Sequence, residues 1–464
     1  MSLHPIKTRF APSPTGLIHI GNARTALFSA LLGEQFLLRI EDTDAERSQP
    51  AFVEALIEDL RWLGLSWDEG PDDAIPVRDW FQSQRGEIYS TYYDQLEASG
   101  SAYPCFCTPQ ELEIHRKVQL SSGRPPRYSG KCAKLSPEER SQRLEKGLQP
   151  TLRFRVDPGS VVEFNDGGRG PQKFQTDDIG DFIIRRADGS AAFFFCNAID
   201  DSLMGVTRVV RGEDHLTNTP RQIMILKALE LPVPQYAHTA LILGDDGAPL
   251  SKRNGSRSIQ ELRESGYFSL AIVNLMARLG HHYDSDALMD WNSLKSGFEI
   301  SSLGRSPARF DITHLRHWQS LVLRQVSDAE LDAWLHAETR ELIPDVAWPA
   351  FRELVRSNCE FPMEAHTWAQ ILFTDEPLAV HESLEADEAY FRAALAAHDQ
   401  HPTDYAGFIA SLKSASGAKG KGLFMPLRIA LSGRHDGPEL AQLYLLLPSA
   451  RLKHRLMAPI ALKD

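Results

Sequence analysis

The stretch from Arg9 to Leu32 constrains the fold more than any other part of this sequence. It opens with an apolar-containing run that ends at Ala11, and two prolines and a glycine follow directly. Neither a strand nor a helix continues easily through such a turn, because proline lacks a backbone donor and glycine is flexible. After Gly21 the chain is rich in good helix formers, which include Ala23, Ala26, Leu27, Ala30 and Leu31. The stretch therefore predicts a strand, a tight turn and a helix.

The start of this helix is a candidate site for a phosphate. Unpaired backbone N–H groups and the positive end of the helix dipole meet there. His19 lies in the turn, and Gly21 allows a flat group such as a nucleobase to approach the backbone closely. The alternative is an ordinary strand-to-helix turn with a surface histidine. The choice depends on a second stretch far along the chain, Pro249-Leu250-Ser251-Lys252-Arg253.

Alternating strands and helices are predicted from Lys7 to about Tyr103 and again from Ala191. The runs typical of buried strands are Phe36–Ile40, Ala192–Phe195, Val206–Val210 and Tyr236–Leu243. Helical spacing of apolar residues occurs over 51–63, 85–99 and 220–229. This alternation indicates a Rossmann-like, doubly wound parallel sheet, whose ligands bind at the carboxyl ends of the strands. His19 and Glu41 would both lie at that edge.

Two other regions have a different character. Residues 104–190 are rich in Ser, Gly and Pro and contain short strand-like runs at 151–156 and 161–164, which predicts an α+β insertion between the two halves of the sheet. From about Ser258 the spacing is almost entirely helical, over 259–265, 269–280, 327–336, 349–357, 387–398 and 438–447. We expect an all-α C-terminal region with no regular strands after Phe310. The stretch 417–422 is predicted to be a flexible basic loop that either touches RNA phosphates or is merely solvated.

Composition narrows the class of protein. The five cysteines do not suggest a disulfide framework, and no apolar run approaches the roughly 20 residues of a membrane span. With no apolar signal core at the N-terminus, we expect a cytoplasmic protein without membrane contact. The net charge of −12 argues at first against a nucleic-acid partner, but net charge does not report a local site. Eight arginines either form a local basic face or are scattered, solvated charges. They are Arg153, Arg155, Arg169, Arg185, Arg186, Arg208, Arg211 and Arg221.

Taken together, four short motifs resemble the class I aminoacyl-tRNA synthetases, and among them the bacterial glutamyl-tRNA synthetases. The block around His19-Ile20-Gly21 is similar to the first ATP signature of the family, and Leu250-Ser251-Lys252-Arg253 is similar to the second, a mobile lysine loop. Ile40-Glu41-Asp42-Thr43-Asp44 and Arg211-Gly212-Glu213-Asp214-His215 match the glutamate branch. The resemblance covers nearly the whole chain.

The resemblance implies that glutamate is activated with ATP and Mg²⁺ to an adenylate and is then transferred to the 3′ end of a tRNA, which must be bound first. It implies His19 and Lys252 as catalytic residues, because this chemistry needs charge neutralisation more than a general base. The ATP-binding residues it implies are Pro12, Ser13, His19, Gly21, Asn22, Ser251, Lys252 and Arg253. Taken alone, Lys252 would be one surface lysine among many.

The glutamate-binding residues that the resemblance implies are Arg9, Ser13, Glu41, Phe193, Asn197 and Arg211. Their chemistry suits the substrate. A γ-carboxylate requires fixed cations and donors, which Arg9, Arg211 and Asn197 supply. The α-ammonium requires acceptors, which Glu41 and Ser13 supply. Individually, Glu41 could be a surface or capping acid, and Arg211 could pair with a neighbouring carboxylate.

Three positions depart from the pattern of the family. Asn22 stands where a second histidine is common, Pro249 stands where the lysine loop often begins with Lys, and Phe193 stands where Tyr is usual. The loss of one hydrogen bond from a tyrosine hydroxyl would cost about 1–3 kcal/mol. Asn22 carries little weight, because members of the glutamate branch commonly vary at this position. Pro249 removes a positive charge, so we expect a weaker affinity for ATP. Phe193 and the short connection Gly33-Glu34-Gln35 suggest a divergent second copy of the enzyme with a remodelled glutamate pocket.

A metal site is predicted in the insertion. Cys105, Cys107, Tyr128 and Cys132 resemble the zinc site of some members of this family, and zinc favours four ligands with thiolates dominant. A C-x-C pair alone is a weak signal, and tyrosine is a poor ligand. The alternative is a surface loop with reduced cysteines.

The resemblance also divides the chain. Residues 1–103 and 191–257 would form the catalytic domain, 104–190 the acceptor-end domain, 258–315 a helical stem-contact domain and 316–464 the anticodon-binding domain. We expect a monomer that charges tRNA(Glu), tRNA(Gln) or both, and the second of these would imply a tRNA-dependent amidotransferase partner. The alternatives are a catalytically inactive tRNA-binding homologue and a transferase of glutamate to a modified tRNA base. The length of the chain argues against the last.

Overall fold

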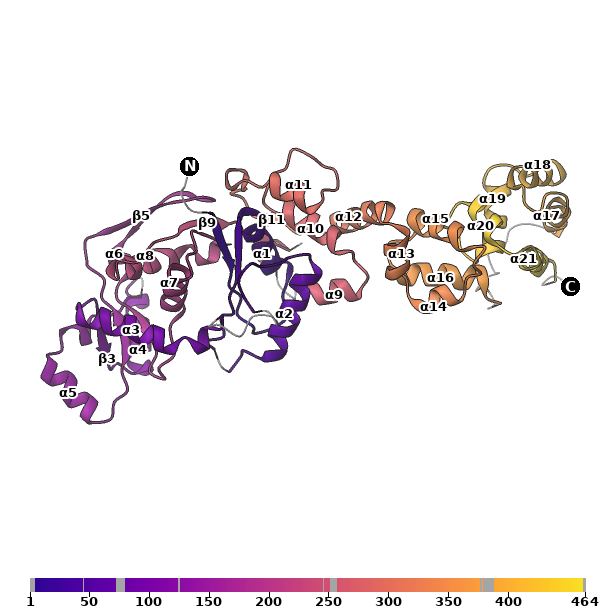
Figure 1. The fold of residues 1–464 in the computed structure, drawn as a ribbon. Helices are drawn as coiled ribbons and strands as arrows, with labels where there is room; N and C mark the ends of the chain where they lie inside the picture. The colour runs from indigo at the N-terminus through magenta and orange to yellow at the C-terminus, as the bar shows by residue number, and fades with distance from the viewer. Residues whose placement is uncertain are drawn as a thin grey trace. The chain divides into compact units, whose positions relative to one another are not determined.

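The computed structural model describes residues 5–44, 46–71, 80–123, 126–244, 246–250, 257–375, 378 and 388–461, and its course is drawn in Figure 1. The chain divides into two compact units. The first comprises Met1–Glu264 and Ile272–His314, and the second comprises Ser265–Ala271 and Leu315–Asp464. In the described part of the chain, no helix has both the length and the apolar character needed to cross a bilayer.

Parallel strands form the centre of the first unit. β1 (Lys7–Phe10) pairs with β2 (Gln35–Leu38), and β8 (Arg208–Gly212) pairs with β9 (Gln235–Thr239). The amide of Thr207 donates to the carbonyl of Lys7 at 2.9 Å, which brings β8 next to β1. The carboxyl ends of these strands consequently face one edge, and the predicted α/β fold class is confirmed. β10 (Ile242–Leu243) and β11 (Ala308–Arg309) form a further parallel pair.

Helices lie beside these strands, and two of them link paired strands: one follows β1 and precedes β2, and another follows β8 and precedes β9 (Figure 1). These helices are α1 (Ile20–Leu32), α2 (Pro50–Trp62), α3 (Gly86–Ala98), α7 (Phe193–Leu203) and α8 (Thr219–Ala228). The prolines at the starts of α2 and α8 occupy the first turn, where a missing N–H breaks no helical hydrogen bond.

The predicted strand over Ala192–Phe195 is wrong, because these residues enter helix α7. A short apolar run does not by itself distinguish a strand from a buried helix. Here the three phenylalanines are the first residues of a helix whose buried side chains include Asn197, Asp200 and Asp201. The misassignment matters for the site, since it hides the four-residue spacing of Phe193, Asn197 and Asp201.

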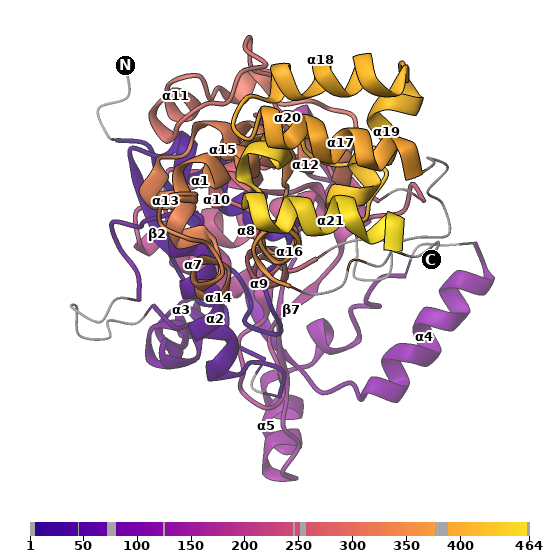
Figure 2. The same ribbon diagram turned by 90° about the vertical axis from the view of Figure 1, so that its right-hand side faces the viewer.

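The inserted segment is α+β, as predicted. β3 (Ala102–Cys105), β4 (Thr151–Phe154) and β7 (Phe182–Arg185) form an antiparallel sheet, and β5 (Val161–Asp166) and β6 (Gly170–Gln175) form a hairpin. Its helices are α4 (Pro109–Ser121), α5 (Pro137–Glu145) and α6 (Thr176–Ile179). α4 and α5 bury no residue and stand apart from the sheet in Figure 2. Both begin with a capping box, which satisfies backbone donors that packing leaves exposed.

The rest of the described chain is helical, as predicted. The helices are α9 (Ile259–Glu264), α10 (Ser269–Arg278), α11 (Trp291–Ser296), α12 (Ile312–Gln325), α13 (Asp328–Trp334), α14 (Ala337–Glu341), α15 (Trp348–Asn358), α16 (Pro362–Phe373), α17 (Glu388–Gln400), α18 (Tyr405–Ser416), α19 (Lys421–Ser432), α20 (Leu440–Leu446) and α21 (Ser449–Ala461). In the second unit they share one apolar core, with Phe351, Phe391 and Phe408 at its centre.

The predicted loop 417–422 is shorter than expected. α18 ends at Ser416, and Gly417 adopts a φ of 67°, which favours glycine at this helix end. α19 already begins at Lys421, so Lys421 and Gly422 are helical. Only residues 417–420 connect the two helices.

Candidate active site

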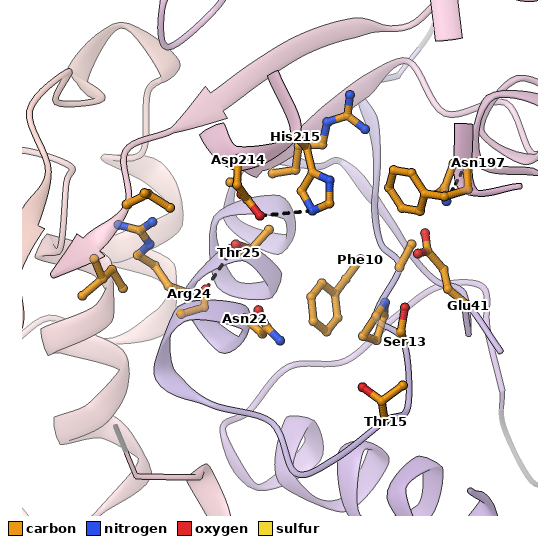
Figure 3. Close-up of a pocket in the computed structure, with 18 of the residues that line it drawn as sticks. Phe10, Ser13, Thr15, Asn22, Arg24, Thr25, Glu41, Asn197, Asp214 and His215 are labelled. Carbon is orange, nitrogen blue, oxygen red and sulfur yellow. Dashed lines mark hydrogen bonds and ion pairs between the residues drawn. The ribbon is translucent and has the colours of Figure 1, made fainter. Parts of the chain in front are cut away.

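A cavity of about 470 Å³ opens at the carboxyl ends of β1, β2 and β8 (Figure 3). In Figure 3, Ser13, Glu41 and Asn197 lie on one side of it, and Asn22, Thr25 and Asp214 lie on the other. The residues that line it are Arg9, Phe10, Ala11, Pro12, Ser13, Thr15, Gly21, Asn22, Arg24, Thr25, Glu41, Phe193, Asn197, Arg211, Gly212, Asp214, His215, Leu241, Ile242, Pro249 and Leu250. The cavity therefore lies where a doubly wound sheet binds its ligands.

Most of the predicted site residues meet in this cavity: Arg9, Pro12, Ser13, Gly21, Asn22, Glu41, Phe193, Asn197 and Arg211. His19 does not line it. It precedes α1 in an extended conformation, with φ −109° and ψ 163°, and forms an isolated bridge with Ser258. Ser251, Lys252 and Arg253 lie outside the described residues.

The start of α1 offers space and polarity for an anion. This helix has no acidic residue in its first turn, and no side chain caps its N-terminus. A methyl group built on Gly21 would meet no protein atom within 4 Å. The backbone donors of the first turn can therefore be reached by a ligand in the cavity, which suits a nucleotide phosphate.

Two arginines make one part of the cavity cationic. Arg9 is held by Asp201, whose Oδ1 lies 3.2 Å from its Nε, and its Nη1 donates to the carbonyl of Val210 at 3.3 Å. Arg211 is 5% exposed, and burial lowers its pKa to about 10. Its Nη1 has no hydrogen-bond partner among the described residues. An unpartnered buried guanidinium nitrogen at a cavity wall is a donor for a substrate carboxylate.

Glu41 gives the same cavity an acceptor. It is 7% exposed, and burial raises its pKa to about 7, although Arg39 and Arg9 act in the opposite direction. Nη2 of Arg39 lies 4.0 Å from its Oε1. The carboxyl group is therefore poised to ionise near neutral pH when a cation such as a substrate ammonium approaches.

A buried ionic network supports these side chains, and sequence reasoning missed it. Arg39, which is fully buried, pairs with Asp201 at 2.8 Å and donates to the amide oxygen of Asn197 at 2.8 Å. Asp200 accepts from Gln82, Arg85 and Tyr89 on neighbouring elements. The signal in the sequence is the pair of adjacent carboxylates within an apolar helix, which buries both of them.

The ring of Phe193 stacks on His215, with 5.3 Å between their centroids. His215 lines the cavity, and burial lowers its pKa, so its ring is neutral at pH 7. Nδ1 of His215 lies 3.2 Å from the side-chain nitrogen Nδ2 of Asn218. Because this nitrogen donates, Nδ1 accepts and Nε2 carries the hydrogen of the ring.

A thiol cluster lies in the inserted segment. The sulfurs of Cys105, Cys107 and Cys132 all lie within 4.8 Å of one another. The hydroxyl of Tyr128 is 3.4 Å from the sulfur of Cys105 and 3.5 Å from that of Cys107. The sulfurs of Cys107 and Cys132 are 3.7 Å apart, and zinc bonded at about 2.3 Å would hold tetrahedral sulfurs about 3.8 Å apart. The four predicted side chains therefore converge in a way that fits zinc.

Comparisons with known proteins agree with this geometry. Residues 5–317 match the family described as tRNA synthetases class I (E and Q), catalytic domain. The chain is 65% identical to Glutamate–tRNA ligase 1 of Methylococcus capsulatus, over 97% of this chain and 98% of that one. It is 53% identical to Glutamate–tRNA ligase 2 of Nitrosococcus oceani, over 98% of both. The crystal structure of a glutamate tRNA ligase from Elizabethkingia meningosepticum in complex with its amino acid matches with a TM-score of 0.87 at 26% identity, over 99% of each chain. The chain belongs to the class I tRNA synthetases of the glutamate and glutamine branch.

Proposed function

We propose that this chain is a glutamate–tRNA ligase that activates glutamate with ATP and transfers it to the 3′ end of tRNA(Glu). Similarity to glutamate–tRNA ligases over the full length supports this function. The observation that carries it in the structure is one cavity that combines Arg211, with its unpartnered nitrogen, and the carboxyl group of Glu41. An amino acid with a side-chain carboxylate presents charges that complement both groups.

In this proposal Arg9, Arg211 and Asn197 bind the γ-carboxylate of glutamate. Guanidinium groups suit this role because they stay charged and present several donors in a fixed plane. Glu41 and Ser13 bind the α-ammonium group. Arg39 and Asp201 hold Asn197 and Arg9 from behind, so that these two side chains are preorganised before the substrate arrives.

The triphosphate of ATP would lie at the start of α1. Pro12, Ser13, Gly21 and Asn22 would contact the nucleotide, and His19 would donate a hydrogen bond to the α-phosphate. Ser251, Lys252 and Arg253 would add donors and charge as pyrophosphate leaves. Enzymes of this class use Mg²⁺, which neutralises charge on the phosphates.

A second cavity, of about 650 Å³, is a candidate for the tRNA 3′ end. It lies along the inserted segment, and its lining includes Arg116, Arg127, Arg153, Arg186 and Arg221 together with Phe182 and Phe194. Cations suit the phosphates of a single strand, and aromatic rings suit its bases. Phe193 lines both cavities, so a strand bound here would lead to the glutamate pocket. We accordingly assign 104–190 to the acceptor end. The assignment of 258–315 to the stem and of 316–464 to the anticodon rests on the resemblance to glutamyl-tRNA synthetases alone.

The test is glutamate charging of purified tRNA(Glu) and tRNA(Gln) side by side. Charging of tRNA(Glu) is the expected result. Charging of tRNA(Gln), alone or as well, would place the enzyme in an indirect route to glutaminyl-tRNA and would imply an amidotransferase partner. Charging of neither, beside an active control enzyme, would contradict the proposal and favour the inactive homologue or a transferase to a modified base.

The affinity for glutamate should rise with pH across neutrality. Burial raises the pKa of Glu41 to about 7, so the carboxylate that binds the α-ammonium is mostly protonated at pH 6 and mostly ionised at pH 8. The glutamate KM should therefore fall about tenfold between these pH values. Glu41→Gln should have a high KM that does not change over this range. A wild-type KM that is constant with pH would show that Glu41 does not control binding.

We also infer that Cys105, Cys107, Cys132 and Tyr128 hold a structural zinc ion. Zinc would crosslink β3 to the turn that contains Cys132 and so stabilise the inserted segment. Purified protein should contain about one equivalent of zinc. Cys132→Ser should lose it, because only two thiolates and a tyrosine, which is a poor ligand, would remain. Cys359→Ser, far from the cluster in sequence, is the matched control and should keep the metal. A wild-type protein free of zinc after growth with zinc would contradict the assignment.

A further inference from the structure

A series of buried hydrogen bonds connects Arg211 to the inserted segment. Arg211 in β8 is paired with His238 in β9, and its Nε donates to Nε2 of His238 at 3.1 Å. Nδ1 of His238 lies 2.5 Å from Oδ2 of Asp166. The three residues are at most 5% exposed. Their hydrogen bonds are thus shielded from water and stronger than the same contacts at the surface.

The neighbours of His238 determine which ring nitrogen carries its proton. A guanidinium group can only donate, so Nε2 must accept from Arg211. The hydroxyl of Thr219 accepts from Nη2 of Arg211 at 2.8 Å and lies 3.2 Å from the same Nε2, to which it donates its hydrogen. The proton of the ring is therefore on Nδ1 and is donated to Asp166. Burial lowers the pKa of His238, which keeps the ring neutral at pH 7.

Asp166 is itself held firmly at the tip of the β5–β6 hairpin. Its Oδ1 accepts from the amides of Gly168, Arg169 and His238 at 2.8–3.0 Å. The amide of Gly167 donates to the carbonyl of Tyr236 at 2.8 Å. A methyl group on Gly168 would overlap the carbonyl of His238, so glycine is required for this approach. The hairpin is thereby fixed against β9.

We propose that Asp166 and His238 are positioning residues for Arg211. The carboxylate of Asp166 selects the Nδ1–H tautomer of His238, and the bare Nε2 then fixes the guanidinium of Arg211, leaving its Nη1 for a substrate carboxylate. The proposal rests on the assignment of Arg211 to glutamate binding. It makes a hairpin of the inserted segment part of the support of the amino-acid pocket.

Asp166→Asn tests the tautomer directly. The asparagine oxygen can keep the three backbone hydrogen bonds, but its NH₂ group faces Nδ1 and drives the proton to Nε2, where it opposes a donor of Arg211. We expect the glutamate KM to rise about tenfold or more, since a hydrogen bond to a charged group is lost. The ATP KM should not change. Asp177→Asn, the same substitution at an exposed site after β6, should leave the KM values for glutamate and ATP unchanged.

His238→Gln separates positioning from a merely structural role. Its side-chain oxygen can accept from Arg211 and has no tautomer to select, so Asp166→Asn should add little in this background. ¹⁵N NMR of histidine-labelled wild-type enzyme should show His238, assigned by its loss in His238→Gln, as the Nδ1–H form. This measurement does not depend on whether Asp166→Asn folds.

The possible failures can be told apart. The proposal would be overturned if Asp166→Asn raised the glutamate KM by the same factor in the wild type and in His238→Gln. A wild-type His238 ring with its hydrogen on Nε2 would also overturn it. The proposal would likewise fail if Arg211→Lys raised the glutamate KM and Asp166→Asn left it normal. A normal KM in Arg211→Lys would instead overturn the assignment of Arg211.

Discussion

Arg211→Lys should lower kcat/KM for glutamate by about 10- to 10⁴-fold, the value of one or two hydrogen bonds to a charged group. Arg211 donates from Nε and Nη2 to His238, Thr219 and Gln222, and its Nη1 remains for the substrate. A lysine ammonium on a flexible stem cannot satisfy these acceptors and a substrate carboxylate at once. Either the ligand or the buried acceptors are left unpaired.

The loss should appear mainly as a higher glutamate KM. Arg211 is proposed to hold a part of glutamate that does not react, so it binds the ground state and the transition state alike. The measurement is ATP–pyrophosphate exchange with tRNA present, as a function of glutamate concentration. Arg208→Lys, at the start of the same strand, is the control and should behave as wild type. If Arg211→Lys retained a wild-type KM, the carboxylate would have to bind elsewhere.

The sequence predicted the parts of the site that depend on local pattern. The turn after β1 and the carboxylate after β2 follow from proline, glycine and apolar spacing within a few residues, and both were found at the cavity. The thiol cluster was predicted from its resemblance to the zinc site of some members of the family, since the local pair of Cys105 and Cys107 is a weak signal by itself. Local composition is sufficient where the chain itself brings the groups together.

The supports of the site could not be predicted in this way. Asp201 lies one helical turn beyond Asn197, but this spacing has meaning only in a helix. The apolar run Ala192–Phe195 instead predicts a strand. Asp166 and His238 belong to a hairpin and a strand that are distant in sequence, and no local pattern relates them. Their contact arises because glycines let the hairpin tip lie against β9. Long-range packing of this kind is decided by tertiary structure.

The same buried network should make Asp201 one of the most sensitive positions for stability. Asp201 is 1% exposed and pairs with Arg9 at 3.2 Å and with Arg39 at 2.8 Å. Removing one partner from a buried ion pair leaves an uncompensated charge, which costs about 3–5 kcal/mol. Asp201→Asn would leave two buried guanidinium groups beside a neutral amide. We expect the thermal unfolding temperature to fall by about 5–15 °C.

The pH dependence separates this charge effect from a change in packing. Burial alone would raise the pKa of Asp201, but Arg9 and Arg39 outweigh it and hold the pKa below its usual value. The stabilisation by the carboxylate is therefore fully present above the unfolded pKa of about 3.9 and is lost as the pH falls through the lower, folded value. The difference between wild type and Asp201→Asn should be constant from pH 7 to pH 5 and should shrink only in stronger acid.

Calorimetry or thermal scans across this pH range would check both expectations. Asp178→Asn is the matched control. Asp178 pairs with Arg127, and its side chain is 67% exposed, so the substitution removes the charge from an exposed ion pair. An exposed pair contributes only about 0–1 kcal/mol, so this variant should unfold close to wild type. If Asp201→Asn did the same, Arg9 and Arg39 would have to be neutralised by other groups. Asp200 and Glu41, at 3.9 Å and 4.0 Å from Arg39, are the carboxylates near enough among the described residues to do so. The charge of Arg39 would then be shared among three acids, and the fold would tolerate the loss of the Asp201 carboxylate.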